Sequence, residues 1–171
     1  MTISSYDPSK DQEFLDFIKE LEKESDRGIA IICHAYVEDK LKELLKKRLI
    51  DDMQFIGRLK RLSFADVIIL CYITGIITKQ EKKDIECLSE VRNKFAHSRR
   101  INDFERPEIS KLCDNLRIPD FLREKKTTRQ KYIVSAGYYI QILNWKLRYV
   151  PKVKTIEEES KGLTTLDHLY V

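Results

Sequence analysis

Glycine and proline are scarce in this chain, with five glycines and four prolines among 171 residues. An all-β fold needs many tight turns, which depend on these two residue types, so their scarcity argues against it. Cysteine is also sparse, and no C-x-x-C pair occurs. The four cysteines are Cys33, Cys71, Cys87 and Cys113. Because each one falls within or beside an apolar helical stretch, reduced thiols in a protein core are favoured over disulfides.

Long apolar runs are missing as well. The most apolar stretch, residues 64–77, contains Asp66 and is too short to span a bilayer, so we expect no membrane association. The first five residues show no basic region followed by an apolar one. We therefore expect no signal peptide and a cytoplasmic protein.

The motifs of several common sites do not occur in the sequence. It contains no Gly-rich phosphate loop, no metal-ligand spacing and no G-x-S-x-G motif. Cys33 and His34 are adjacent, and adjacent side chains on a helix point about 100° apart, so they do not form a ligand pair. We therefore expect neither a metal ion nor a cofactor.

The bulk composition is that of a soluble globule with a core, since 42% of the residues are hydrophobic and 35% are charged. The net charge of +4, from 32 basic and 28 acidic residues, is weak and does not by itself argue for nucleic acid. The length is most simply that of one domain. We expect this domain over residues 1–150 and a partly ordered tail over residues 151–171.

Apolar residues recur at spacings of three and four, which predicts an all-α bundle of about six helices. The helices are expected over about residues 9–21, 25–49, 64–74, 78–95, 107–115 and 127–149. Their starts are marked by Ser9 with Gln12, Ser25 or Asp26, Ser63, Thr78 with Glu81, Pro107, and Thr127 or Thr128. Gly75 and Pro151 mark two helix ends, and a loop is expected near Asp51, Asp52 and Gly57.

One six-residue run carries chemistry that no other cluster in the chain offers: residues 92–97, with the sequence RNKFAH. Leu88, Val91 and Phe95 define the buried stripe of its helix, whereas Asn93 and His97 are four apart and share a different face. Arg92 and His97 are five apart, which is about 140° around an ideal helix and ~7.5 Å along it. They would both approach one phosphodiester if the helix frays or tightens near its end.

Two interpretations of this run are open. Metal-free RNA cleavage needs a proton-transfer group, which is His97, and a cation for the phosphate charge, which is Arg92, with Asn93 orienting either one. Arg99 and Arg100 would then hold the RNA backbone, and a two-fold dimer would double the site. Alternatively, Arg92 and His97 only compensate the dipole and cap the carbonyl groups of a helix C-terminus.

Three further residues are candidates for supporting roles. Asp26 and Arg27 lie at a helix start, where they either cap the helix or reach the end of the RNKFAH helix to orient His97 or Asn93. Glu38 falls with Lys40 on the charged side of its helix, where it is either solvated or part of the site.

Two other regions suit partner binding. The basic stretch at residues 123–131 is either a solvated loop or a contact for phosphates or an acidic partner. In the last helix Tyr132 and Tyr139 match the apolar face and are expected in the core. Tyr138, Trp145 and Tyr149 spread toward a second face, which suits a subunit or partner interface.

RNKFAH resembles the RNxxxH signature of HEPN domains, all-helical modules that include many metal-independent ribonucleases acting as dimers. Three blocks in order are similar to the mannitol repressor (MtlR) family. They are ESDRG at residues 24–28 with AYVEDKL at 35–41, LSF at 62–64 leading to YITGII at 72–77, and the helix ending in RNKFAH. The similarity covers roughly residues 11–115.

The resemblance implies an all-α, HEPN-like or MtlR-like fold and two alternative functions. One is a regulator of carbohydrate-operon transcription that acts through protein partners, since the family lacks a recognisable DNA-binding motif. This chain likewise shows no helix-turn-helix with a basic recognition helix and no zinc-finger spacing. The other is a metal-independent ribonuclease, with the catalytic roles of the signature carried by Arg92, Asn93 and His97. A homodimer is expected in either case, and RNA is a partner only in the second.

Overall fold

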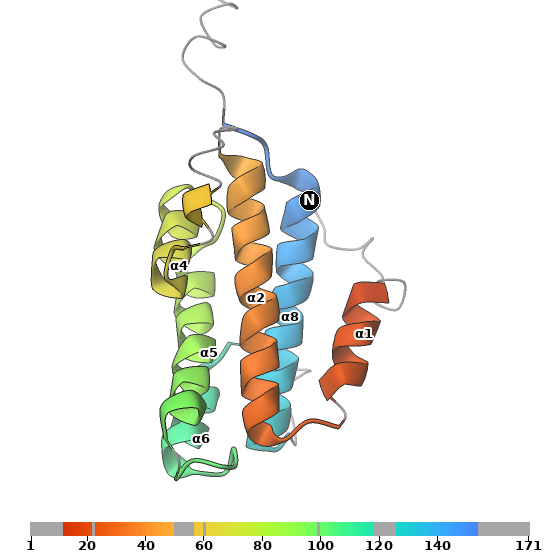
Figure 1. Ribbon diagram of the computed structural model, residues 1–171, viewed down its shortest axis with the longest axis vertical. Coiled ribbons are helices and arrows are strands. Elements are labelled where there is room, and N and C mark those ends of the chain that lie inside the picture. Colours follow the sequence, from red (N-terminus) through yellow and green to blue (C-terminus); the bar gives the residue numbers. More distant parts are fainter. Residues whose placement is uncertain are drawn as a thin grey trace, which may run out of the picture.

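Two long helices form the centre of the structure, a computed structural model that describes residues 12–21, 23–49, 57–59, 61–98, 100–117 and 126–153. They are α2, Asp26–Arg48, and α8, Thr128–Tyr149. The two helices run side by side along the length of the molecule (Figure 1). Most of the hydrophobic core lies between them and their neighbours.

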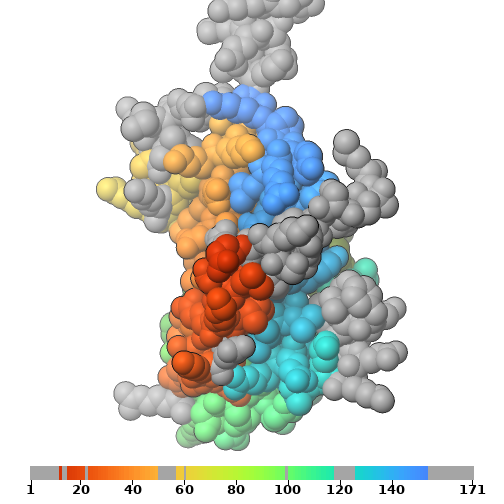
Figure 2. All heavy atoms as spheres, turned by 90° about the vertical axis from the view of Figure 1, so that its right-hand side faces the viewer, coloured from red at the N-terminus to blue at the C-terminus, as the bar shows by residue number. Residues whose placement is uncertain are grey.

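The other helices pack around this central pair. α4, Phe64–Ile73, and α5, Lys79–His97, cover one side, and α1, Gln12–Leu21, lies across α2 and α8 on another (Figures 1 and 2). α6, Pro107–Asn115, packs against α5 and α8. No strand occurs among the described residues. The structure is therefore all-α, as the sequence predicts.

The helix ends are where the capping residues predict them. Ser25, Ser63 and Thr127 each accept a hydrogen bond from a backbone N–H of the first turn. Thr78 and Glu81 form a reciprocal capping box at the start of α5. Gly75 follows α4 with φ of +72°, a conformation that a side chain disfavours. The predicted cap at Ser9 and the part of the predicted loop at Asp51 and Asp52 lie outside the described residues. The sequence predicts Gly57 in the same loop, but residues 57–59 form a short helical segment.

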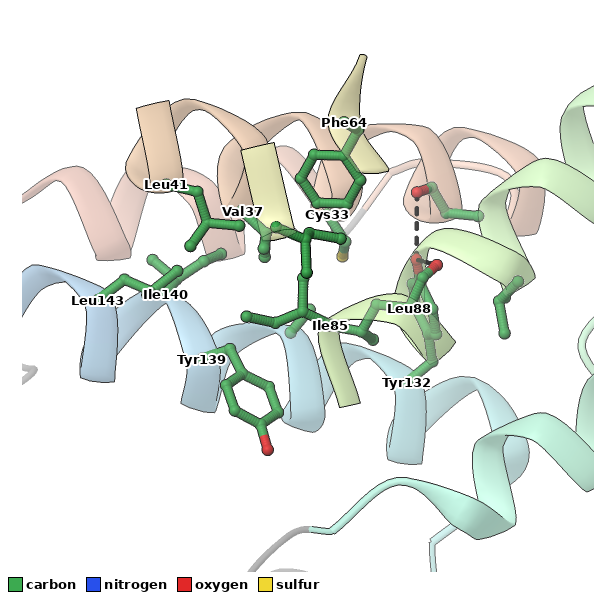
Figure 3. Close-up of a cluster of buried hydrophobic side chains, with 14 of the residues drawn as sticks. Cys33, Val37, Leu41, Phe64, Ile85, Leu88, Tyr132, Tyr139, Ile140 and Leu143 are labelled. Atoms are coloured by element: carbon green, nitrogen blue, oxygen red, sulfur yellow. Dashed lines mark hydrogen bonds between the residues drawn. The ribbon is translucent and has the colours of Figure 1, made fainter. Parts of the chain in front are cut away.

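A continuous set of buried side chains joins α2, α5 and α8 (Figure 3). Tyr132 on α8 is fully buried, and its hydroxyl donates to the carbonyl oxygens of Ala30 on α2 and Leu88 on α5, at 3.3 and 3.2 Å. One tyrosine thus ties three helices together. Leu88, Val91 and Phe95 are buried, which confirms the predicted inner stripe of α5.

Lys40 departs from the sequence prediction. The helical pattern places it on a charged face, but its side chain is buried because the aliphatic stem packs on the protein while the ammonium group lies 3.5 Å from Glu43.

The four cysteines are free, and Cys33, Cys71 and Cys113 are buried, as expected for core thiols. The described helices include none that is long and apolar enough to cross a membrane.

The chain turns back on itself after α8. The backbone N–H of Val153 donates to the carbonyl of Arg48 at 2.7 Å, and the Arg48 guanidinium donates to the carbonyl of Pro151 at 2.9 Å. Residues 151–153 therefore lie against the end of α2. The rest of the predicted tail, residues 154–171, lies outside the described part of the chain.

Candidate functional site

The RNKFAH run forms the last turns of α5. The helix remains α-helical to His97, and Ser98 ends it by donating its backbone N–H to the carbonyl of Lys94 at 3.1 Å. The helix therefore neither frays nor tightens before His97. A common site for Arg92 and His97 has to be made by their side chains.

Arg92 bends toward the face that carries His97. Its Nη1 donates to Oδ1 of Asn93 at 2.7 Å, and Asn93 is one helical turn before His97 on the same face. Arg92 is half-buried, whereas Asn93 and His97 are exposed to solvent. The hydrogen bond turns the Arg92 guanidinium toward Asn93, on the side of the helix that also carries His97. The result is a surface cluster of a cation, an amide and an imidazole.

A second histidine lies behind this cluster. His34 on α2 is only 3% exposed, and its Nδ1 is 3.4 Å from Nη2 of Arg92. The His34 ring packs against the ring of Phe64 at the start of α4, with 4.3 Å between centroids. Glu38 lies one turn further along α2, with Oε2 3.6 Å from the same Nδ1. A guanidinium group can only donate, so the contact with Arg92 is a hydrogen bond in the tautomer that leaves Nδ1 free to accept and carries the proton of the neutral ring on Nε2.

The surroundings keep His34 uncharged. Burial is the largest cause that lowers its pKa, to about 4, and the charges of Arg92 and Lys42 lower it further, while Glu38 acts in the opposite direction. Among the described residues, Nε2 of His34 is a buried side-chain nitrogen with no hydrogen-bond partner. Leaving such a donor unpaired costs about 1–3 kcal/mol. His34 therefore lowers the stability of the core, and it contacts Arg92, a residue of the RNKFAH run.

Sequence reasoning missed His34 because it was judged only beside Cys33. A signal for it exists in the helical spacing. Arg27, Ile31, His34 and Glu38 follow one another at intervals of four, three and four residues, which places them along one face of α2. Glu38 belongs to the cluster through His34 and also pairs with Lys42 at 2.6 Å. It is thus not a simply solvated carboxylate.

Arg27 does reach the end of α5, but it contacts the backbone rather than the side chains of Asn93 or His97. Its Nη2 donates to the carbonyl oxygens of Ser98 and Ile101, at 2.9 and 3.2 Å. These bonds fix the segment that follows the helix. Arg27 is therefore a scaffold residue for the site, and the carbonyl groups just beyond the helix end are held without help from His97.

Asp26 stabilises a different part of the same region. Its carboxylate accepts from the backbone N–H of Phe104 at 3.0 Å and from Nη1 of Arg129 at 2.6 Å. Arg129 also donates to the carbonyl of Glu24 at 3.1 Å. Asp26 thus joins the start of α2 to the start of α8 and to the chain before α6, and it does not touch the RNKFAH cluster.

The remaining basic candidates for phosphate binding differ in whether their charge is already paired with an acidic side chain. Arg100 is exposed near the cluster, with its backbone N–H bonded to Oγ of Ser98 at 3.3 Å, whereas Arg99 lies outside the described residues. In the basic stretch, Arg129 pairs with Asp26 and Lys131 pairs with Asp114 at 2.6 Å. These two cations have structural partners, so they are weaker candidates for phosphate binding than Arg100.

The described part of the chain holds no group of three or more His, Cys, Asp or Glu side chains placed to bind a metal ion. In comparisons with protein-family models, with curated proteins and with solved structures, nothing matches this chain. The resemblance to HEPN domains and to the mannitol repressor family therefore rests on the sequence blocks alone.

Proposed function

We propose that the protein is a metal-independent ribonuclease of the HEPN type, in which His97 transfers protons and Arg92 binds the phosphate. The observation that carries this proposal is the Arg92–Asn93 hydrogen bond, which turns the guanidinium toward the face of His97. Exposed Asn93 and His97 leave this face open to a large substrate. The expected cytoplasmic location and homodimer belong to the same proposal.

The reaction assigned to the cluster is attack of a ribose 2′-oxygen on the adjacent phosphorus. The bond from the 2′-oxygen to phosphorus forms while the bond from phosphorus to the 5′-oxygen breaks. His97 accepts the 2′-hydroxyl proton, and His97 of a second copy in a two-fold dimer supplies a proton to the leaving oxygen. Arg92 stabilises the charge that builds on the phosphate oxygens. The products end in a cyclic phosphate and a 5′-hydroxyl group.

The test is incubation of the purified protein with mixed RNA in EDTA, followed by analysis of the new ends. The wild type should cleave, and His97→Ala should lower the rate by about 10²–10⁴-fold, the usual contribution of a proton-transfer group. Arg92→Lys should also lose activity, because lysine keeps the charge but cannot bond to Asn93 and His34 together. Lys94→Ala, on the same helix, is the matched control and should retain activity. Intact RNA with a folded wild type would refute the proposal.

A second candidate function is favoured by a separate observation on α4. Three side chains on its outer face are exposed, Ile69 by 47%, Tyr72 by 39% and Ile73 by 67%. A helix that is apolar on all sides is normally covered on all sides, so this face suits a protein partner. This is the behaviour expected of a regulator similar to the mannitol repressor family, which acts on transcription through other proteins.

Substitutions on α4 and at His97 distinguish the two candidate functions. If the protein is a regulator of this kind, it should bind a defined protein partner, and its affinity for that partner should be lost in the double variant Ile69→Ser with Ile73→Ser and retained in His97→Ala. Isothermal titration with the purified partner would measure this. A ribonuclease alone predicts the reverse pattern, with RNA cleavage lost in His97→Ala and kept in the α4 double variant.

A further inference from the structure

We propose that His34 is a positioning residue for Arg92, and that its neutral ring aims the guanidinium at a phosphodiester of bound RNA. The inference deepens the proposed function and rests on it. Three observations carry it: the burial of His34, the 3.4 Å approach of its Nδ1 to Arg92, and the lack of a partner for its Nε2 within the described residues.

The arrangement leaves Arg92 able to bind an anion. A guanidinium has five N–H donors, and within the described part of the chain two of them face partners, Asn93 and His34, so three are left for a ligand. The two bonds restrict the plane of the guanidinium group from two sides. Orientation before the ligand arrives lowers the entropy that binding has to overcome.

A neutral acceptor behind Arg92 has a specific advantage. A carboxylate in the position of His34 Nδ1 would also orient the guanidinium, but it would compensate the positive charge that attracts the phosphate. The neutral imidazole orients the Arg92 guanidinium without balancing its positive charge. Glu38, the nearby carboxylate, is paired with Lys42 at 2.6 Å, so much of its charge is balanced locally. A lysine or arginine in place of His34 would repel Arg92.

Stability alone does not explain a histidine at this position. An apolar side chain of similar size would fill the space against Phe64 and would remove a nitrogen, Nε2, that has no hydrogen-bond partner within the described residues. The chain instead keeps a polar group in the core, and among the described residues the polar groups nearest to its Nδ1 are Arg92 at 3.4 Å and Glu38 at 3.6 Å. Residues that reduce stability locally, as His34 does, are often found at functional sites.

Two substitutions of His34 separate orientation from folding. His34→Asn places a carbonyl oxygen close to the position of Nδ1 and so keeps the acceptor. His34→Leu fills similar space without an acceptor. The probe is a 2′-O-methyl RNA oligonucleotide, which binds but cannot be cleaved because it has no free 2′-hydroxyl. Its affinity, the cleavage of unmodified RNA and the unfolding temperature are measured for each protein.

We expect His34→Asn to bind the oligonucleotide within about threefold of the wild type. His34→Leu should unfold at an equal or higher temperature but lose about 10-fold or more in affinity and in cleavage rate, as expected when a catalytic group is misplaced. Nitrogen NMR of the wild type should show His34 with its proton on Nε2. A proton on Nδ1, or a folded His34→Leu protein with wild-type affinity, would overturn the proposal.

The same measurements distinguish this inference from the proposed function. If the wild type binds the oligonucleotide but cleaves no RNA, the ribonuclease proposal fails, and the variants still decide the role of His34 through affinity. If the wild type does not bind the oligonucleotide at all, RNA is not the ligand of Arg92, and the inference about His34 falls with it.

Discussion

Nη2 of Arg92 lies 3.4 Å from Nδ1 of His34, a residue 58 positions earlier in the chain. This contact joins the middle of α2 to the last turns of α5 and gives the two described histidines different environments. His34 is buried and His97 is exposed on the surface cluster. The roles proposed for them differ in the same way: orienting a cation suits a buried neutral ring, and exchanging protons with a substrate requires an accessible one.

The stability of the fold should depend on pH through His34. Its pKa is lowered from 6.5 to about 4, so below pH 6.5 the unfolded chain binds a proton that the folded protein refuses. The free energy of unfolding is therefore undiminished above pH 6.5 and is lost as the pH falls toward 4, by about 3 kcal/mol. Urea denaturation at several pH values would measure this.

His34→Asn should abolish most of this pH dependence, because the variant has no imidazole to protonate in either state. His97→Ala is the control, since it removes an exposed histidine and leaves the buried one in place. If wild type and His34→Asn lose stability in parallel between pH 6.5 and 4, the burial of a neutral His34 is wrong.

Arg27→Ala should destabilise the segment after α5. The substitution removes two hydrogen bonds from a charged donor to the carbonyl oxygens of Ser98 and Ile101, and partial exposure limits the loss to about 2 kcal/mol. Urea denaturation gives the total, and faster amide exchange around residues 98–104 gives the location. Arg100→Ala removes an exposed guanidinium from the same segment and should change stability by less than about 0.5 kcal/mol. Equal effects of the two substitutions would contradict the role of Arg27.

Tyr139→Phe should weaken the junction of α5 and α8. Asp84 is 2% exposed and accepts from the Tyr139 hydroxyl, from Nε2 of Gln80 at 3.0 Å and from the backbone N–H of Arg117 at 3.3 Å. Burial and the carboxylate of Asp84 raise the pKa of Tyr139, so the hydroxyl remains a donor. Its removal leaves the buried carboxylate with fewer donors and should cost about 1–3 kcal/mol.

Tyr138→Phe is the matched control for this junction, since Tyr138 is adjacent and half-buried but does not bond to Asp84. Thermal or urea denaturation of both variants checks the difference. A loss in Tyr138→Phe as large as that in Tyr139→Phe would show that the hydroxyl bond to Asp84 contributes little.

The thiols should be unreactive in the folded protein. Burial raises the pKa of Cys71 and of Cys113 to about 12 and that of Cys33 still higher, so almost no thiolate is present at neutral pH. Labelling with a disulfide reagent should be slow before unfolding and should reach all four cysteines in denaturant without a reductant. Rapid labelling of Cys71 or Cys113 in the native protein would contradict their place in the core.

The helices could be predicted well because their signals are local. The caps at Ser25, Ser63 and Thr78 need only a hydroxyl at the residue before the helix and a free backbone N–H within the next turn. Lys40 was predicted wrongly because helical periodicity assigns a whole residue to one side. A long side chain can instead bury its stem and keep its charged end near an acid.

The candidate site could be predicted only in part. The order of Arg92, Asn93 and His97 along the chain shows which groups α5 carries, but the direction of the Arg92 side chain depends on what lies opposite. The sequence alone determined the bundle of capped helices and the RNKFAH cluster, since both follow from spacing within a few residues. Tertiary structure decided that His34, on another helix, meets Arg92, because residues distant in the chain are brought together only when helices pack.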